Sequence, residues 1–96
     1  MEEDRKYTQL FDNDGKIARW PSKRKYQLML INHMATKVPA DKDFIEREVN
    51  EIIKAEITID DFVLFRREMI EQKVLNRTAD GKTYRKNPDF KEIVVE

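Results

Sequence analysis

Lysine and arginine side chains can bind phosphate groups, and this chain gathers them in two short segments. Residues 16–25 contain five cations and no acid, and residues 77–86 contain four cations and one acid, Asp80. The chain as a whole is neutral, with 19 basic and 19 acidic residues among 96. Folding either joins the two basic segments in one patch or leaves them as two solvated surfaces, and the sequence leaves both interpretations open.

The first basic segment contains the start of a predicted helix. Pro21 and Ser22 are typical of a first turn, where Ser22 can cap free amides and proline needs no N–H. Cations in a first turn face the unfavourable end of the helix dipole, which suggests a use for them. We therefore interpret the cations around this start as candidate phosphate contacts: Arg19, Lys23, Arg24 and Lys25.

Trp20, the only tryptophan, lies inside this segment. We expect its ring to pack at the end of the core beside Phe11 and Ile17. The alternative is an exposed aromatic platform on which a base could stack.

Other site chemistries lack the residues that they need. The absence of cysteine excludes disulfides, thiol catalysis and thiolate metal sites. His33 is the only histidine, and it has no clustered ligand that would complete a zinc site. The turn at 12–15 begins like a calcium loop, but Leu10 and Pro21 then occupy ligand positions.

The carboxylates at 46–51 ("EREVNEI") invite comparison with a catalytic acid–base pair. They alternate with other polar residues on one helix face, and nothing elsewhere in the chain completes such a site. We therefore predict that the protein is not an enzyme, and that it has no catalytic residue, no metal and no cofactor.

Apolar periodicity predicts one mostly helical α+β domain over residues 10–86, flanked by 1–9 and 87–96. Three helices are expected, at 22–37, 45–55 and 58–72, the last capped by Thr58 or Asp60. The period then changes to two, and Asp80-Gly81 separates two β-like runs, which predicts a hairpin. Phe44 anchors a helix or adds an extended residue to the sheet, and 92–96 pairs as a strand or frays.

The same spacing predicts which side chains are buried. The first helix should bury an apolar stripe with Leu30 at its edge: Leu28, Ile31, Met34, Ala35 and Val38. The second and third helices should bury shorter stripes: Ile45, Val49, Ile52 and Ile53, and Phe62, Phe65, Met69 and Ile70.

Three helices followed by a hairpin form the element order of a winged helix-turn-helix. In that arrangement the helices at 45–55 and 58–72 are the helix-turn-helix, and the hairpin at 77–85 is the wing. Other topologies that combine helices with a hairpin remain open.

Four stretches of sequence also carry a family resemblance: "FDNDGKIARWPSKRKYQ" at 11–27, "FIEREVNEII" at 44–53, "LFRREMIEQKVLNRT" at 64–78 and "DGKTYRK" at 80–86. The chain resembles an uncharacterised bacterial family, a domain of unknown function found alone or fused to winged-helix transcription regulators. The most specific motifs are "RWPSKR", "EREVNEI" and "RRE". The resemblance implies a winged-helix-like fold and a role in transcription regulation, and it brings no established binding residue.

The first function hypothesis is binding of duplex DNA. The hairpin and "PSKRK" should then contact phosphates, and Arg67 is the candidate for a base edge. The hairpin candidates are Arg77, Lys82, Arg85 and Lys86. Residues 60–73 hold four acids and three bases, which is unfavourable beside phosphates. Arg66 and Arg67 therefore have an alternative role, pairing with Glu71 or with the carboxylates at 46–51.

The second hypothesis is a protein-interaction module on the same scaffold, without DNA binding. The acidic second helix and the zero net charge favour it, and Leu64, if exposed beside Arg67, would suit an interface. The partner would be another protein or a second copy of the chain. One continuous basic face would favour DNA, whereas basic segments on opposite faces would favour the interaction module.

The ends and the apolar runs predict the compartment. No apolar run approaches the ~20 residues that a membrane span needs. The acidic N-terminus, 1–4, is unlike a signal peptide. We therefore expect a cytoplasmic protein without a membrane partner.

Overall fold

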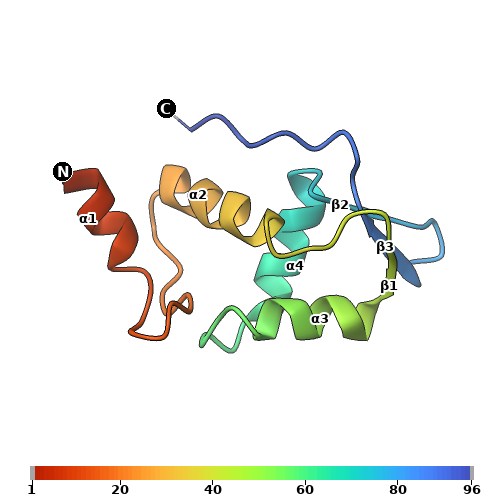
Figure 1. Cartoon of the computed structure of the whole chain (residues 1–96), viewed down its shortest axis with the longest axis horizontal. Coiled ribbons are helices and arrows are strands. Elements are labelled where there is room, and N and C mark those ends of the chain that lie inside the picture. Colours follow the sequence, from red (N-terminus) through yellow and green to blue (C-terminus); the bar gives the residue numbers. More distant parts are fainter. Residues whose placement is uncertain (1, 96) are drawn as a thin grey trace.

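The chain folds into helices and a small sheet that enclose one core (Figure 1). The computed structural model describes residues 2–95, and their side chains from residue 5 onward. The elements in chain order are α1 (Glu2–Thr8), α2 (Arg24–Ala35), β1 (Asp43–Ile45), α3 (Glu46–Lys54), α4 (Phe62–Glu71), β2 (Leu75–Arg77) and β3 (Thr83–Lys86). The predicted α+β class, the three main helices and the hairpin are therefore confirmed.

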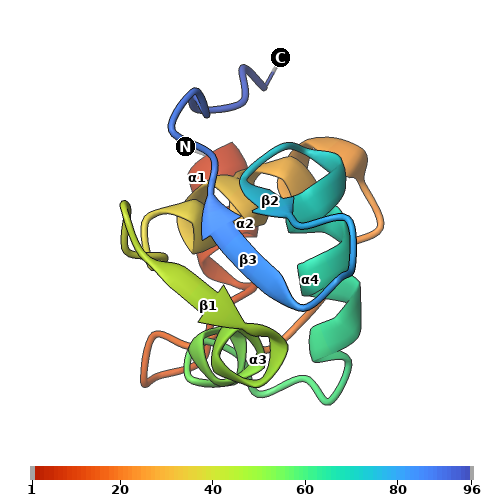
Figure 2. The same ribbon diagram turned by 90° about the vertical axis from the view of Figure 1, so that its right-hand side faces the viewer.

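The sheet has three antiparallel strands in the order β1-β3-β2 (Figure 2). Phe44 pairs with Tyr84, so the extended residue expected at Phe44 is part of a strand. The hairpin turn has the predicted chemistry, because Gly81 has a positive φ of 73°. The Asp80 carboxylate accepts hydrogen bonds from the Thr78 hydroxyl (2.6 Å) and the Lys82 N–H (3.0 Å), and these bonds lower the pKa of Asp80.

The segment before α2 is held by backbone bridges. The Asp12 carboxylate accepts from the N–H groups of Asp14 and Lys16, which forms the predicted turn. Ile17 then runs extended and fully buried, and it bridges both Phe11 and Ile57. These bridges fix the residues before α2 against the connection between α3 and α4.

Two predicted helix caps are wrong. Ser22 does not cap α2, because the N-cap position is Lys23, which makes no side-chain capping bond. Neither Thr58 nor Asp60 caps α4, because the helix begins later and the Asp61 carboxylate accepts from the Leu64 N–H at 3.2 Å.

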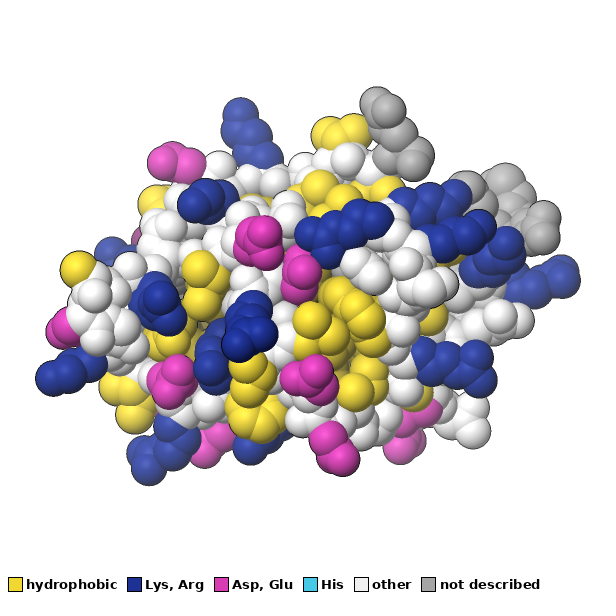
Figure 3. All heavy atoms as spheres, turned by 180° about the vertical axis from the view of Figure 1, so that it is seen from behind, with side chains coloured by type: hydrophobic (Ala, Val, Ile, Leu, Met, Phe, Trp, Pro, Cys, Tyr) yellow, Lys and Arg dark blue, Asp and Glu magenta, His cyan; other side chains and the backbone are white. Residues whose placement is uncertain are grey.

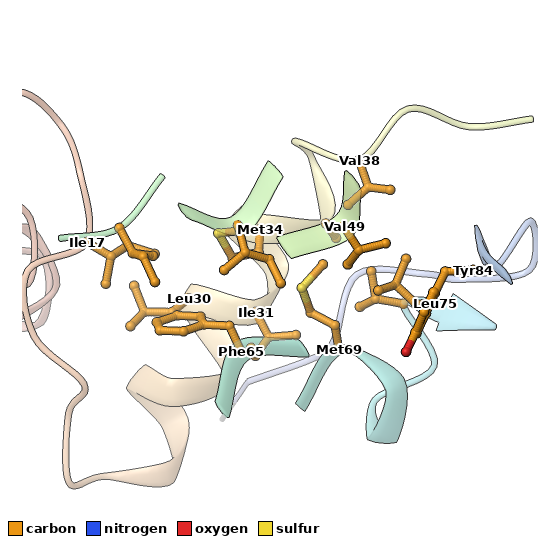
Figure 4. Packing of buried hydrophobic residues seen from close by; sticks show 14 of the residues in the cluster. Ile17, Leu30, Ile31, Met34, Val38, Val49, Phe65, Met69, Leu75 and Tyr84 are labelled. Atoms are coloured by element: carbon orange, nitrogen blue, oxygen red, sulfur yellow. The ribbon is translucent and has the colours of Figure 1, made fainter. Parts of the chain in front are cut away.

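The core runs as one row of apolar side chains from Ile17 to Tyr84 (Figure 4). The stripe of α2 is rotated from the prediction, since Tyr26 and Leu30 are buried whereas Leu28 is half-buried. α4 buries Phe65 and Met69 as predicted, while its other two expected core residues are half-buried.

Ile45 was predicted to be buried, and it is 47% exposed. Ile45 is the last residue of β1 and lies outside α3, and its N–H donates to the Glu48 carboxylate at 3.0 Å. Because residues alternate across a strand, Ile45 faces away from the buried Phe44. Val49 and Ile53 carry the buried face of α3.

The described residues after β3 form no regular strand. Residues 91–95 have no secondary structure, although Ile93 hydrogen bonds to Asn32 of α2. Residue 96 of the predicted strand lies outside the described residues. None of the helices in the described part of the chain has the length and apolarity to cross a membrane.

We expect Phe65→Ala to lower the free energy of unfolding by about 3–5 kcal/mol, because the fully buried ring would leave a cavity at the centre of the row. Urea unfolding measures this change. Val94→Ala is the control: Val94 is 84% exposed, so its loss should change stability by no more than about 0.5 kcal/mol. Similar losses for both variants would contradict the core described above.

Candidate nucleic-acid interface

The two basic segments lie toward opposite ends of the molecule. The hairpin that contains 77–86 is at one end of the long axis, and α1 with the start of α2 is toward the other (Figure 1). Figure 3 shows Lys and Arg side chains gathered over the α1 and α2 end, while acidic and basic side chains alternate over the middle of that face. On the face shown, the cations form no continuous band between the two ends.

Arg24 has a structural role that the sequence did not indicate. Its guanidinium forms a two-pronged ion pair with Glu68 of α4, with N–O distances of 2.9 and 3.1 Å. The hydrogen bond to this carboxylate raises the pKa of Arg24, whose side chain is 48% exposed against 14% for Glu68. The pair joins the first turn of α2 to α4, so one of the first-turn cations is accounted for without a ligand.

The other nominated residues around the α2 start differ in exposure. Arg19 and Lys23 are exposed and form no ion pair among the described residues. Lys25 is half-buried, with its ammonium 5.1 Å from the centre of the Tyr26 ring. Trp20 packs as expected, but its edge-to-face neighbour is Phe65, at 5.2 Å between ring centres. Phosphate contacts at this end would come from Arg19 and Lys23.

The two arginines of α4 divide between the predicted alternatives. Arg66 pairs with Glu46 at 3.3 Å and donates to the Asn50 side chain, so it joins α4 to α3. Arg67 is exposed and has no such partner among the side chains that the structure describes, those of residues 5–95. Leu64 is half-buried, so the exposed leucine expected beside Arg67 is not present.

Two carboxylates of "EREVNEI", those of Glu46 and Glu48, are engaged in the fold rather than merely solvated. Glu46 pairs with Arg66 and also accepts from the Tyr84 hydroxyl at 3.2 Å, while Glu48 caps the start of α3. The pairing of Arg66 with a carboxylate at 46–51 was one of the predicted alternatives, whereas the Tyr84 contact and the Glu48 cap were not predicted.

The hairpin presents two cations freely and holds two others. Arg77 and Lys82 are exposed, and neither forms an ion pair in the described part of the chain. Arg85 pairs with Asp43 across the β1–β3 pair at 2.9 Å. Lys86 is half-buried and lines a hollow beside Phe90. The hairpin thus offers fewer available cations than its composition suggests.

Sequence reasoning also missed Lys73, an exposed cation between α4 and the hairpin. It has a positive φ of 65°, and the next N–H, of Val74, reaches back to Met69 at 2.8 Å. This is the left-handed end of a helix, where glycine or asparagine is the usual signal. A lysine gives no such signal, so the sequence did not predict this left-handed helix end, which lies between Arg67 and Arg77 in the chain.

The region that contains both basic segments matches a known protein family. A family model described as "Uncharacterized protein conserved in bacteria (DUF2087)" matches residues 16–86. The chain belongs to this bacterial DUF2087 family. The match begins beyond α1 and ends with β3, and the three motifs at 19–24, 46–52 and 66–68 lie within it. No curated protein and no solved structure matches the chain.

His33 lies apart from the basic residues, against the ring of Phe11 at 5.2 Å between ring centres. Its Nε2 is buried without a hydrogen-bond partner. Burial is the first cause that lowers the pKa of His33, the nearby Lys37 adds to it, and Glu56 opposes it. No group of three potential metal ligands surrounds it or any other part of the described chain.

We expect His33 to make the protein less stable as the pH falls below about 6.5, the usual pKa of an unfolded histidine. The unfolded chain takes up this proton first, because the folded pKa is lowered. His33→Gln removes this contribution, so the stability advantage of the parent over the variant should shrink between pH 7.5 and pH 5. Urea unfolding at several pH values measures the difference, and a constant or growing advantage at low pH would contradict the assignment.

Proposed function

We propose that this DUF2087 domain is a DNA-binding winged helix that acts in transcription regulation. The connectivity carries the proposal. From α2 to β3 the order is helix, strand, helix, helix, strand, strand, and the first strand pairs with the last. A winged helix has this order, with α3 and α4 as the helix-turn-helix and the β2–β3 hairpin as the wing.

The exposed cations of α4 and the hairpin give this proposal its chemistry. Arg67 is on the helix that would enter the major groove, and its guanidinium could bind a guanine edge. Arg77 and Lys82 are on the hairpin that would follow the phosphate backbone. Arg85 and Lys86 are secondary candidates, because Arg85 has an intramolecular partner and Lys86 is half-buried.

The distribution of charge limits the strength of such binding. Glu68 and Glu71 share α4 with Arg67, and the chain has no net charge. Each phosphate contact releases counterions, so few contacts mean weak binding with a shallow salt dependence. We therefore propose weak binding to duplex DNA with a shallow salt dependence. Arg19 and Lys23 contribute little to it, because they lie toward the end of the molecule away from the hairpin.

The test is a titration of the full chain with duplex DNA at ~50 mM salt, where phosphate contacts are strong. Lys82→Glu, at a phosphate contact, should weaken binding about tenfold and reduce the salt slope by about one. Arg67→Glu, at a base edge, should weaken binding about tenfold and relax the preference for guanine. Lys91→Glu is the matched control, since Lys91 is exposed on the segment after the sheet and its replacement makes the same charge change. Absence of binding by the parent chain, or equal losses in all three variants, would refute the proposal.

A second candidate function is a protein-interaction module on the same scaffold. Two observations favour it: the two basic segments lie toward opposite ends of the molecule (Figure 1), and acidic and basic side chains alternate on the face between them (Figure 3). Such a surface complements a protein surface of mixed charge better than a row of phosphates. Sedimentation and a pull-down with the parent chain test it: a strict monomer that captures no partner would count against this module.

A further inference from the structure

A single asparagine binds both backbone groups of a residue that is distant along the chain. The Asn32 side-chain nitrogen donates to the Ile93 carbonyl at 3.0 Å, and the Ile93 N–H donates to the Asn32 side-chain oxygen at 2.8 Å. One side-chain amide thus replaces the neighbouring strand that an extended backbone would otherwise pair with. The contact with Asn32 uses only backbone groups of residue 93, and the half-buried Ile93 side chain adds packing against the core.

Two hollows flank this contact on the surface of α2. One has a volume of ≈270 Å³ and is lined by Ala35, Lys86 and Phe90, among others. The other has a volume of ≈240 Å³ and is lined by Tyr7, Met29 and His33, among others. Asn32, Thr36 and Glu92 line both, so one hollow lies on each side of the contact between α2 and the segment. The surface of α2 around Asn32 that the segment covers is called the α2 groove below.

The segment in the groove has few other attachments. Within the described residues, Ile93 supplies the only backbone groups of 91–95 that hydrogen bond to the rest of the chain. Phe90 and Ile93 are half-buried against the core, whereas Val94 is 84% exposed. Segments with so few buried contacts open at a much lower free energy than the core does.

A side-chain turn directs the segment onto α2. The Asn87 side-chain oxygen accepts from the Asp89 N–H at 3.0 Å, and the Asn87 carbonyl accepts from the Phe90 N–H at 3.1 Å. Pro88 lies inside this turn. Beyond it, the chain runs back over α2 toward α1 (Figure 1). Straightening this one turn would carry the segment away from its own α2 without disturbing the sheet.

Asn87 is anchored to its own chain, because its N–H donates to the Val74 carbonyl at 2.8 Å and its side-chain nitrogen to the Lys73 carbonyl at 3.0 Å. We propose that residues 88–95 exchange between two copies of this chain, so that each copy places its segment in the α2 groove of the other. The occupant is a second copy because the groove already fits this segment, and every contact of the closed chain can form again between copies. The closed chain and the exchanged dimer differ mainly in the turn at 87–90. Within one chain the segment has an effective concentration on the order of millimolar, which favours the closed form at low protein concentration. The exchanged fraction should therefore rise as the protein concentration approaches that value. This inference is independent of DNA binding.

Engineered cysteines test the exchange cleanly, because the chain has none of its own. Thr36 and Glu92 are both exposed and line the same two hollows. Thr36→Cys and Glu92→Cys are made in separate full-length chains, which are then mixed in a glutathione buffer. We expect the mixed disulfide between the two chains to form several-fold more than between Thr36→Cys and Asp41→Cys, a pair with an exposed cysteine outside the groove. Its yield should rise with protein concentration.

Asn32 variants distinguish a mixed disulfide that forms in the α2 groove from one that forms by chance collision of two chains. Asn32→Leu in the Thr36→Cys chain should reduce the mixed disulfide to the yield of the control pair, and Asn32→Asp, which keeps an acceptor and loses the donor, should give an intermediate yield. Circular dichroism verifies that each variant is folded. The double variant Thr36→Cys/Glu92→Cys reports the closed form, because its two cysteines can form a disulfide within one chain. If that intrachain bond forms while the mixed disulfide never exceeds the control at any concentration, the groove serves only its own segment and the proposal is wrong.

Discussion

The burial of one face of α4 is the constraint on which the rest of the structure depends. Phe65 and Met69 are fully buried, and their side chains meet those of α2, α3 and the sheet in one row. In a chain of 96 residues there is room for only one such core, so each element must supply residues to the same row. The outward face of α4 is fixed by the same contacts, and this leaves Arg67 exposed.

Ion pairs around α4 then decide which charges remain available for a partner. Arg24 and Arg66 hold Glu68 and Glu46, which joins α4 to α2 and to α3. Exposed pairs of this kind contribute little stability singly, but they orient the helices and occupy cations that composition alone would assign to a ligand. The surface of this domain is therefore more mixed in charge than its basic segments imply, which is why weak DNA binding and protein interaction are both worth testing.

The groove on α2 uses a different physical device. A backbone segment outside regular structure must satisfy its polar groups, and here one side-chain amide satisfies both groups of Ile93. Such a contact does not depend on covalent continuity between the segment and the domain. The family match ends at residue 86, so α2 and Asn32 lie within the matched residues, whereas Ile93 lies beyond them.

The sequence by itself determined the elements that arise from local preferences. The turns at Asp12–Gly15 and Asp80-Gly81, the three main helices and the hairpin all follow from side chains within a few residues of one another. Only the tertiary structure decided the buried stripe of α2, where Tyr26 and Leu30 are buried and Leu28 is not, because that choice depends on which neighbours α2 meets. It also decided that Arg24 has a carboxylate partner 44 positions away while Arg67 has none in the described chain, and that the two basic segments lie toward opposite ends. These outcomes depend on contacts between distant parts of the chain, which no local pattern specifies.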